Sequence, residues 1–143
     1  MLPDFSPRSF RDSVLQTILE NDLIIKGQHV LAGVSGGQDS VAMLHVLHNF
    51  ATTIGFSLTV CHLDHGFRGE ESKGDRMFVE SLCENLGVEC ISEYVDVASR
   101  IKTSGKNAQI AAREIRHKFY QITRERIGAD SVALGHTSDD SSE

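Results

Sequence analysis

A glycine-rich turn at Ser35–Ser40 carries the residue types of an anion-binding loop. Its letters are SGGQDS, and it lies between an apolar run with strand character (29–34) and a helix-like run that starts at Val41. Two glycines let a phosphate group approach the backbone, serine hydroxyls add donors, and the helix N-terminus presents unpaired N–H groups. The turn therefore predicts a site for the phosphates of a nucleotide. The plain alternative is an ordinary strand–turn–helix with Asp39 or Ser40 as the helix N-cap.

Asp39 is the unusual residue of this turn, because a carboxylate repels phosphates. The turn has neither the lysine of the G-x-x-x-x-G-K-[ST] loop nor the spacing G-x-G-x-x-G. Asp39 is tolerable there if a metal ion bridges it to the phosphates or if it caps the helix. A second pair of carboxylates, Asp139 and Asp140, follows Gly135. With Asp39 these could hold Mg²⁺, although one of them could instead cap the next helix.

A second polar segment, HLDHGFRGEES at 62–72, combines an arginine with histidines and acidic residues. Arg68 could bind a phosphate or a substrate carboxylate, or it could form a surface pair with Glu71 or Asp75. The spacing of the other candidate ligands is not that of a zinc site, which disfavours metal binding by His62, Asp64 and His65.

The third segment is a basic helix, expected from Asn107 to about Ile127. Eight of the fourteen basic residues lie between Arg100 and Arg126, where only two acidic residues oppose them, although the whole chain has a net charge of −6. One flank of the helix could bind a triphosphate or a nucleic-acid backbone. The alternative is that this flank is ordinary solvated surface. That flank consists of Arg113, Arg116, Tyr120 and Arg124, beside an apolar stripe of Ala108, Ala111, Ala112, Ile115, Phe119 and Ile122.

Strand-like and helix-like segments alternate around these motifs. Hydrophobic spacing and turn residues predict helices over 9–21, 41–53, 72–86 and 107–127. In the third of these helices, the side chains expected to be buried are Met77, Phe78, Leu82 and Leu86. Strands are predicted over 29–34, 56–62, 88–97 and 131–134, and a mobile loop over 98–106.

This alternation predicts an α/β fold, with a doubly wound parallel sheet. Three polar motifs then follow strands and converge on the carboxyl edge of the sheet, where open α/β folds bind ligands. We expect residues 1–27 to form a lead-in with one helix and residues 28–143 to form the domain. The last βα unit is incomplete, so we interpret the chain as an N-terminal fragment.

Composition indicates one soluble globular domain. Hydrophobic residues make up 40% of the 143, and no apolar run approaches the ~20 residues of a membrane span. The start lacks the apolar core of a signal peptide. The three cysteines, at 61, 83 and 90, include no C-x-x-C pair. They are therefore expected to be buried free thiols of a cytoplasmic protein, rather than disulfides or cluster ligands.

The turn SGGQDS resembles the SGGxDS signature of the PP-loop ATP pyrophosphatases. The ordered set SGGQDS, HLDHGFRGEES, NAQIAAREIRHKFY and ALGHTSDDSSE, over about residues 28–143, is similar to the catalytic domain of the tRNA(Ile)-lysidine synthetase family. This resemblance implies a PP-loop (adenine nucleotide alpha hydrolase-like) fold. It also implies a ligase reaction in which ATP adenylates the wobble cytidine of an isoleucine tRNA, and free lysine then displaces AMP to form lysidine.

The resemblance also implies roles for individual residues. Catalytic roles fall to Asp39, Asp140 and Asp139, with Mg²⁺ held by Asp39 and Asp140. ATP binding falls to Ser35, Gly36, Gly37, Gln38, Asp39, Ser40, His65, Arg68, Arg113, Arg116 and His136, with the two helix arginines also candidates for tRNA contact. The lysine site is expected beyond residue 143.

The chain departs from the family pattern at His117, Thr137 and Ser141-Ser142, which affects substrate detail more than ATP binding. Besides an ATP pyrophosphatase that aminates a small metabolite, which would not need the basic helix, two other functions remain open. One is a tRNA 2-thiocytidine-type sulfur transferase, which the absence of C-x-x-C disfavours. The other is a nucleotide-binding module without catalysis, which the retained Asp39 and Asp140 disfavour.

Overall fold

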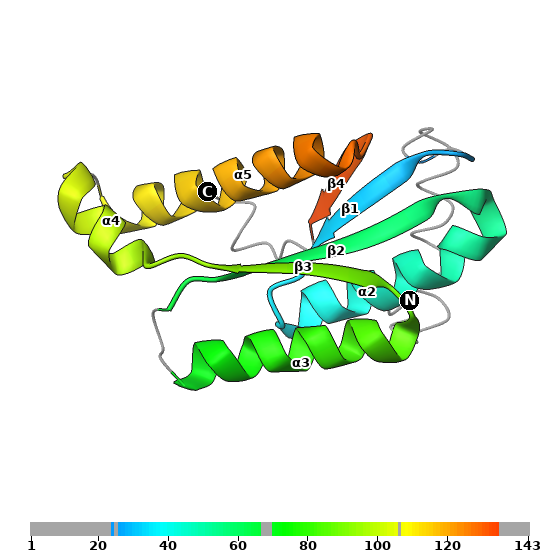
Figure 1. The fold of residues 1–143 in the computed structure, drawn as a ribbon, viewed down its shortest axis with the longest axis horizontal. Coiled ribbons are helices and arrows are strands. Elements are labelled where there is room, and N and C mark those ends of the chain that lie inside the picture. Colours follow the sequence, from blue (N-terminus) through cyan, green and yellow to red (C-terminus); the bar gives the residue numbers. More distant parts are fainter. Residues whose placement is uncertain (1–23, 25, 67–69, 106, 135–143) are drawn as a thin grey trace, which may run out of the picture.

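The structure, a computed structural model, describes residues 24, 26–66, 70–105 and 107–134. Its centre is a four-stranded, all-parallel sheet in the order β3-β2-β1-β4. The strands are β1 (His29–Gly33), β2 (Ser57–Asp64), β3 (Glu89–Tyr94) and β4 (Ser131–Leu134). The expected parallel α/β sheet is confirmed (Figure 1).

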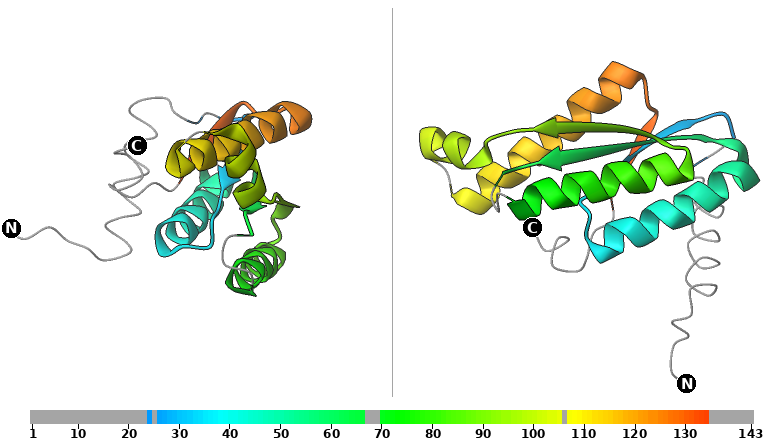
Figure 2. Two further views of the ribbon diagram at one scale, coloured as in Figure 1. Left: turned by 90° about the vertical axis from the view of Figure 1, so that its left-hand side faces the viewer. Right: turned by 60° about the horizontal axis from the view of Figure 1, so that its bottom comes forward.

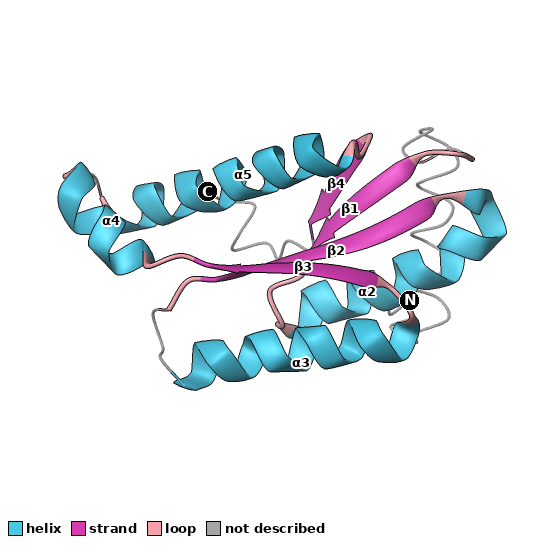
Figure 3. Cartoon of the chain, in the orientation of Figure 1, coloured by secondary structure: helices cyan, strands magenta, loops and turns pink. Residues whose placement is uncertain are grey.

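Helices cover both faces of this sheet, as a doubly wound fold requires. Two views show α2 and α3 on one face and α5 on the other (Figures 1 and 2). Figure 3 shows how helices and strands alternate along the chain. The helices are α2 (Gln38–Phe50), the π-helical turn η1 (Ala51–Gly55), α3 (Glu70–Leu86), α4 (Val97–Ser104) and α5 (Ala108–Ile127).

The central strand β1 separates two hydrophobic cores. Val30 and Ala32 point to the core under α2 and α3, whereas Leu31 points to the core under α5. All three side chains are fully buried, because β1 has a strand on each side and helices on both faces. This explains the nearly continuous apolar sequence of the strand.

The order of crossovers places a topological switch beside β1. The connections through α2 and α3 lie on one face and lead outward from β1 to β2 and then β3. The chain then returns across the other face through α5 to β4, which pairs with the opposite edge of β1. In open α/β sheets, ligands bind at the carboxyl ends of the strands where the winding reverses. Here that is the end of β1.

Several expected boundaries are wrong. β2 continues two residues past the expected end and includes Asp64, whereas β3 stops at Tyr94. The segment expected as a mobile loop is mostly helix α4, because the Asp96 side chain accepts a hydrogen bond from the Ser99 N–H and caps it. The α-helix after the glycine-rich turn ends at Phe50, and the chain then forms the π-helical turn η1. The expected helix over 9–21 lies outside the described residues.

The buried stripes of two helices also differ from expectation. On α3, Met77 and Phe78 are 57% and 50% exposed, and Val79 and Cys83 are buried instead. The apolar pattern misleads because the polar Arg76 takes a sheet-facing position, where it approaches a carboxylate at the end of β2. On α5, Ile122 is 44% exposed and Thr123 is buried in its place.

The cysteines are free, as expected. Cys61 and Cys83 are buried, and Cys90 is half-buried. Among the described helices, none is both long and apolar enough to span a membrane.

Candidate functional site

A pocket of about 260 Å³ opens at the carboxyl ends of β1 and β2. Four parts of the chain line it. The turn after β1 contributes Val34, Ser35, Gly36 and Gly37, the end of β2 contributes His62, Leu63, Asp64 and His65, α3 contributes Asp75, and α5 contributes Arg116 and Tyr120. Two polar motifs and the basic helix thus meet at one place, which is the switch point of the sheet.

The turn after β1 is held by its own serine residues. The Ser35 N–H donates to the Ser40 Oγ over 3.2 Å, and the Ser40 hydroxyl donates to the Gly37 carbonyl over 2.9 Å. The Gly37 N–H donates to the Ser35 Oγ over 3.2 Å. The N-cap of α2 is Gly37, with no side-chain capping bond, so neither Asp39 nor Ser40 caps the helix. The buried Ser40 therefore shapes the turn and leaves the helix N-terminus open to an anion.

Gly33 lets α5 approach the end of β1. A Cβ at this position would lie 2.6 Å from the Leu134 Cδ2 and 2.9 Å from the Tyr120 Cε1. Both separations are far below van der Waals contact, so only glycine fits without a shift. The close approach puts the Tyr120 ring against the strand that leads into the turn, and it makes α5 a wall of the pocket.

His62 joins the end of β2 to the start of the turn. Its side chain is 3% exposed, and its Nδ1–H donates to the Val34 carbonyl over 2.8 Å. A carbonyl only accepts, so Nδ1 must carry the proton of this hydrogen bond. Nε2 is buried and has no hydrogen-bond partner among the described residues. Sequence reasoning weighed His62 only as a metal ligand and missed this role.

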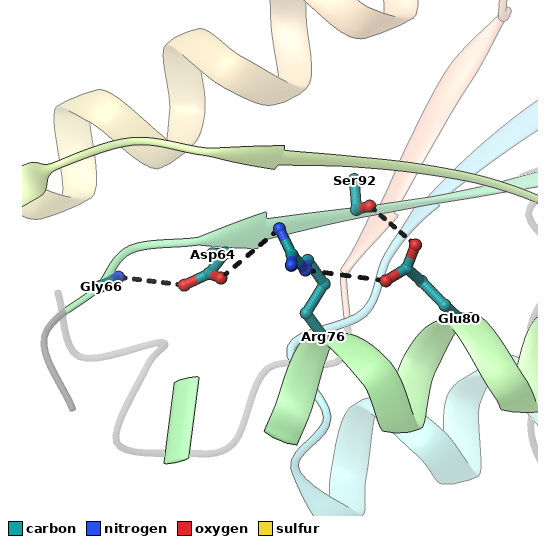
Figure 4. Close-up of polar contacts among 5 residues, drawn as sticks. All are labelled: Asp64, Gly66, Arg76, Glu80 and Ser92. Carbon is teal, nitrogen blue, oxygen red and sulfur yellow. Dashed lines mark hydrogen bonds and ion pairs between the residues drawn. The ribbon is translucent and has the colours of Figure 1, made fainter. Parts of the chain in front are cut away.

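Asp64 is the second buried polar residue at this strand end. It is 5% exposed, and its Oδ1 accepts a hydrogen bond from the Gly66 N–H over 3.1 Å. Its Oδ2 lies 3.9 Å from the Arg76 Nη1, which reaches across from α3 (Figure 4). Two acidic side chains, Asp64 and Asp75, therefore line the pocket beside the glycine-rich turn. The segment that contains Asp64 was expected at this edge of the sheet, whereas Asp75 was considered only as a surface partner of Arg68.

The basic flank expected on α5 divides into separate groups. Arg116 and Tyr120, one helical turn apart, line the pocket. Arg113 is half-buried and is not part of the lining. Arg124 lies near the C-terminal end of α5, where its Nη1 donates a hydrogen bond to the Ala129 carbonyl over 3.3 Å. The pocket thus receives one cation from the described part of this helix.

Comparison with known proteins identifies the family. Residues 9–143 match the model of the PP-loop domain, an ATP-binding family. The chain belongs to the PP-loop family. The resemblance stated from the four motifs is thereby confirmed at the level of the family, whereas the division at residues 27 and 28 stays a prediction.

Curated relatives of this PP-loop domain are tRNA(Ile)-lysidine synthases. The protein from Bacillus anthracis is 39% identical over 132 residues, which is 92% of this chain and 28% of the relative. The protein from Thermotoga maritima is 41% identical over 118 residues, which is 82% of this chain and 28% of the relative. The chain therefore spans little more than a quarter of the length of these relatives.

The fold also matches a solved structure. A U34-tRNA thiolase from Methanococcus maripaludis, solved with its [4Fe-4S] cluster, superposes with a TM-score of 0.75. The match covers 96% of this chain and 48% of the thiolase, at 23% sequence identity. At this identity the likeness supports the fold alone, and it agrees with the doubly wound PP-loop architecture.

The pocket contains part of the expected site of this PP-loop domain. Ser35, Gly36, Gly37, His65 and Arg116 line it. Gln38 and Asp39 are exposed in the first turn of α2, next to the lining. Two further expected residues, Ser40 and Arg113, are described but do not line the pocket. The others lie outside the described part of the chain: Arg68, His136, Asp139 and Asp140.

Among the described residues, no three His, Cys, Asp or Glu side chains lie close enough together to bind a metal ion by themselves. Mg²⁺ usually takes one or two carboxylates and completes its shell with water and phosphate oxygens. Asp39 stands at the turn where nucleotide phosphates would lie, so its position is compatible with such a site.

Proposed function

We propose that this chain is the ATP-binding part of a tRNA(Ile)-lysidine synthase. In the proposed reaction, ATP adenylates the wobble cytidine of an isoleucine tRNA with release of pyrophosphate. Free lysine then displaces AMP to form lysidine. The observation that carries the proposal is the meeting of the glycine-rich turn and Arg116 in one pocket, in a chain 39–41% identical to lysidine synthases.

The pocket suits the phosphate end of ATP. Its 260 Å³ is below the usual range of about 300–1,000 Å³ for small-molecule sites, so it fits part of a nucleotide. The N–H groups at the start of α2 and the helix dipole favour an anion there. The guanidinium of Arg116 adds a fixed positive charge on the opposite wall. Together these groups would stabilise the pyrophosphate as it leaves.

Asp39 and Asp140 are the proposed Mg²⁺ ligands, with Asp139 as the alternative to Asp140. A bound Mg²⁺ would neutralise charge on the phosphates and favour departure of pyrophosphate. Asp39 is exposed in the first turn of α2, directly after the turn that lines the pocket.

The tRNA is proposed to contact the basic helix. Lys118 and Arg126 are exposed on α5, and cations of this kind bind phosphate backbones. The lysine site is proposed to lie beyond residue 143. The reaction is proposed to take place in the cytoplasm, where its tRNA substrate is found.

AMP formation tests the proposal. The full-length protein is incubated with ATP and an isoleucine tRNA transcript, with and without lysine. We expect AMP to form only with the tRNA, and to form faster with lysine. AMP formation that needs tRNA but ignores lysine would exclude lysidine synthesis, and ATP binding without AMP would favour the non-catalytic module.

A variant tests the role of the carboxylate. Asp39→Asn removes the charge of a metal ligand but keeps its size, so we expect pyrophosphate release to fall at least 100-fold while thermal stability stays unchanged. The measurement is steady-state pyrophosphate release at saturating ATP. Unchanged turnover would remove Asp39 from the mechanism.

The cysteines argue against the sulfur-transferase alternative. Burial raises the pKa of the Cys61 thiol to about 12, so it is a poor nucleophile at neutral pH. Cys83 is buried, and none of the three cysteines lines the pocket. A sulfur carrier would need a reactive thiol at the site.

A further inference from the structure

We propose that Arg76 is a positioning residue of the nucleotide pocket, which acts by holding the Asp64 carboxylate and, through it, the turn at Asp64–Gly66. The proposal rests on the proposed function for its kinetic test. It concerns a residue outside all four sequence motifs.

The turn after β2 is organised by Asp64. Its Oδ1 accepts from the Gly66 N–H, and its backbone carbonyl accepts from the Val95 N–H over 2.9 Å. Gly66 has φ +71°, and a Cβ there would lie 3.0 Å from the Tyr94 ring. Only glycine suits this conformation and this contact. The turn therefore has one well-defined arrangement, and it presents His65 to the pocket.

Arg76 is the only positive partner of Asp64 within the described residues. Its Nη1 lies 3.9 Å from the Asp64 Oδ2, and its Nε lies 3.7 Å from the Glu80 Oε1 (Figure 4). Glu80 is itself held, because its Oε2 accepts from the Ser92 hydroxyl over 3.3 Å. The guanidinium thus lies between two carboxylates, one at the end of β2 and one on its own helix. This arrangement links β2, α3 and β3.

The charge of Arg76 matters because Asp64 lines the pocket proposed for polyphosphate. A nearly buried carboxylate without a counter-charge is costly and repels phosphates. Arg76 offsets that charge from behind the pocket wall, without lining the pocket itself. Its loss should therefore weaken ATP binding more than it slows the chemical step.

Kinetics of the full-length protein test this role. We expect Arg76→Met to raise the KM for ATP about 10-fold, with kcat within about 2-fold. This size is taken by analogy from metal sites, where the loss of a side chain that orients a ligand costs about 10–100-fold. Arg76→Lys, which keeps the charge, should restore most of the loss. The matched control is Lys73→Met, which makes the same charge change at an exposed position of α3.

A double-mutant cycle tests whether Arg76 acts through Asp64. Because Asp64→Asn removes the charge that Arg76 offsets, adding Arg76→Met to it should raise the KM for ATP less than 3-fold further. Independent, multiplying effects would overturn the proposal. So would a KM unchanged in Arg76→Met, or no rescue by lysine.

Hydrogen exchange separates this inference from the proposed function. In Arg76→Met, the Gly66 amide should exchange at least 10-fold faster than in the parent protein, whereas Lys73→Met should leave it unchanged. This readout needs no enzymatic activity. A parent protein that fails to turn over ATP would contradict the proposed function alone, whereas unchanged Gly66 exchange would overturn the positioning role.

Discussion

His62 illustrates at residue scale how the pocket is built from the end of one strand. Its Nδ1–H holds the Val34 carbonyl, and Val34 is followed directly by the glycine-rich turn. Two residues along the same strand, Asp64 holds the turn that follows β2. The two loops that border the pocket are therefore anchored by alternate residues of β2, on one face of the sheet. Single substitutions there should act on both stability and ligand binding.

Gly33→Ala should disturb the wall formed by α5. The added methyl would meet Leu134 and Tyr120 within 3 Å, so we expect a loss of about 1–3 kcal/mol of stability, the usual cost of overpacking. ATP affinity should fall as well, because Tyr120 lines the pocket. Urea unfolding and equilibrium ATP binding are the measurements.

The matched control is Gly74→Ala, in the interior of α3, where a Cβ meets nothing within 4 Å. It should stabilise the protein by about 0.5–1 kcal/mol, because alanine is the better helix former. Equal effects of the two substitutions would show that the tight contact at Gly33 is not present in solution.

Cys61 gives a prediction about pH. Burial raises the pKa of its thiol from 9.0 to about 12, so the folded protein keeps the proton where an unfolded chain loses it. Its alkylation by iodoacetamide at pH 9 should be at least about tenfold slower than that of N-acetylcysteine, because the buried thiol keeps its proton and is shielded from the reagent. The stability linked to this thiol is complete below pH 9 and is lost as pH rises towards 12.

Site-resolved mass spectrometry after alkylation measures the rate at Cys61. A rate at pH 8 equal to that of N-acetylcysteine would contradict the burial of this thiol.

At the scale of elements, the ends of α5 were predictable from local chemistry. Asn107 accepts a hydrogen bond from the Gln109 N–H over 2.9 Å and caps the helix, and Gly128 ends it in the left-handed conformation. The doubly wound sheet was equally predictable, because four strand-like runs alternate with helical ones. These features depend on residues close in sequence.

The rest of the site depends on contacts between distant residues. Residues 63 and 64 at the end of β2 were expected in a loop, because the ion-pair partner of Asp64 lies in α3 and is distant in sequence. The buried stripe of α3 was misjudged for the same reason, since Arg76 occupies a position that the pattern reserves for an apolar residue. Helix α4 is short and polar, and only its cap and the buried Val97 reveal it.

Asn107→Ala tests how much the cap contributes. Loss of the side-chain acceptor should lower the free energy of unfolding by about 1 kcal/mol. Gln121→Ala, at an exposed position within α5, should change it by less than about 0.5 kcal/mol. Urea unfolding compares the two variants, and equal values would mean that the cap does not support the helix.

At the scale of the whole molecule, topology brings distant segments to one site. The loops after β1 and β2 are neighbours because these strands pair, and α5 reaches the same edge as it crosses from β3 to β4 on the other face. Basic residues are concentrated in this crossover, although the chain is acidic overall. A nucleotide at the switch point and a polyanion along α5 are therefore compatible with a single bound complex.

Transfer of lysine to tRNA tests the central proposal most directly. The full-length protein is incubated with ATP, radiolabelled lysine and an isoleucine tRNA transcript, and the tRNA is then digested to nucleosides. The proposed function predicts label in a modified cytidine from the wobble position, dependent on ATP and absent when that cytidine is replaced by uridine. An unlabelled wobble cytidine, in a preparation that binds ATP and the tRNA, would contradict it.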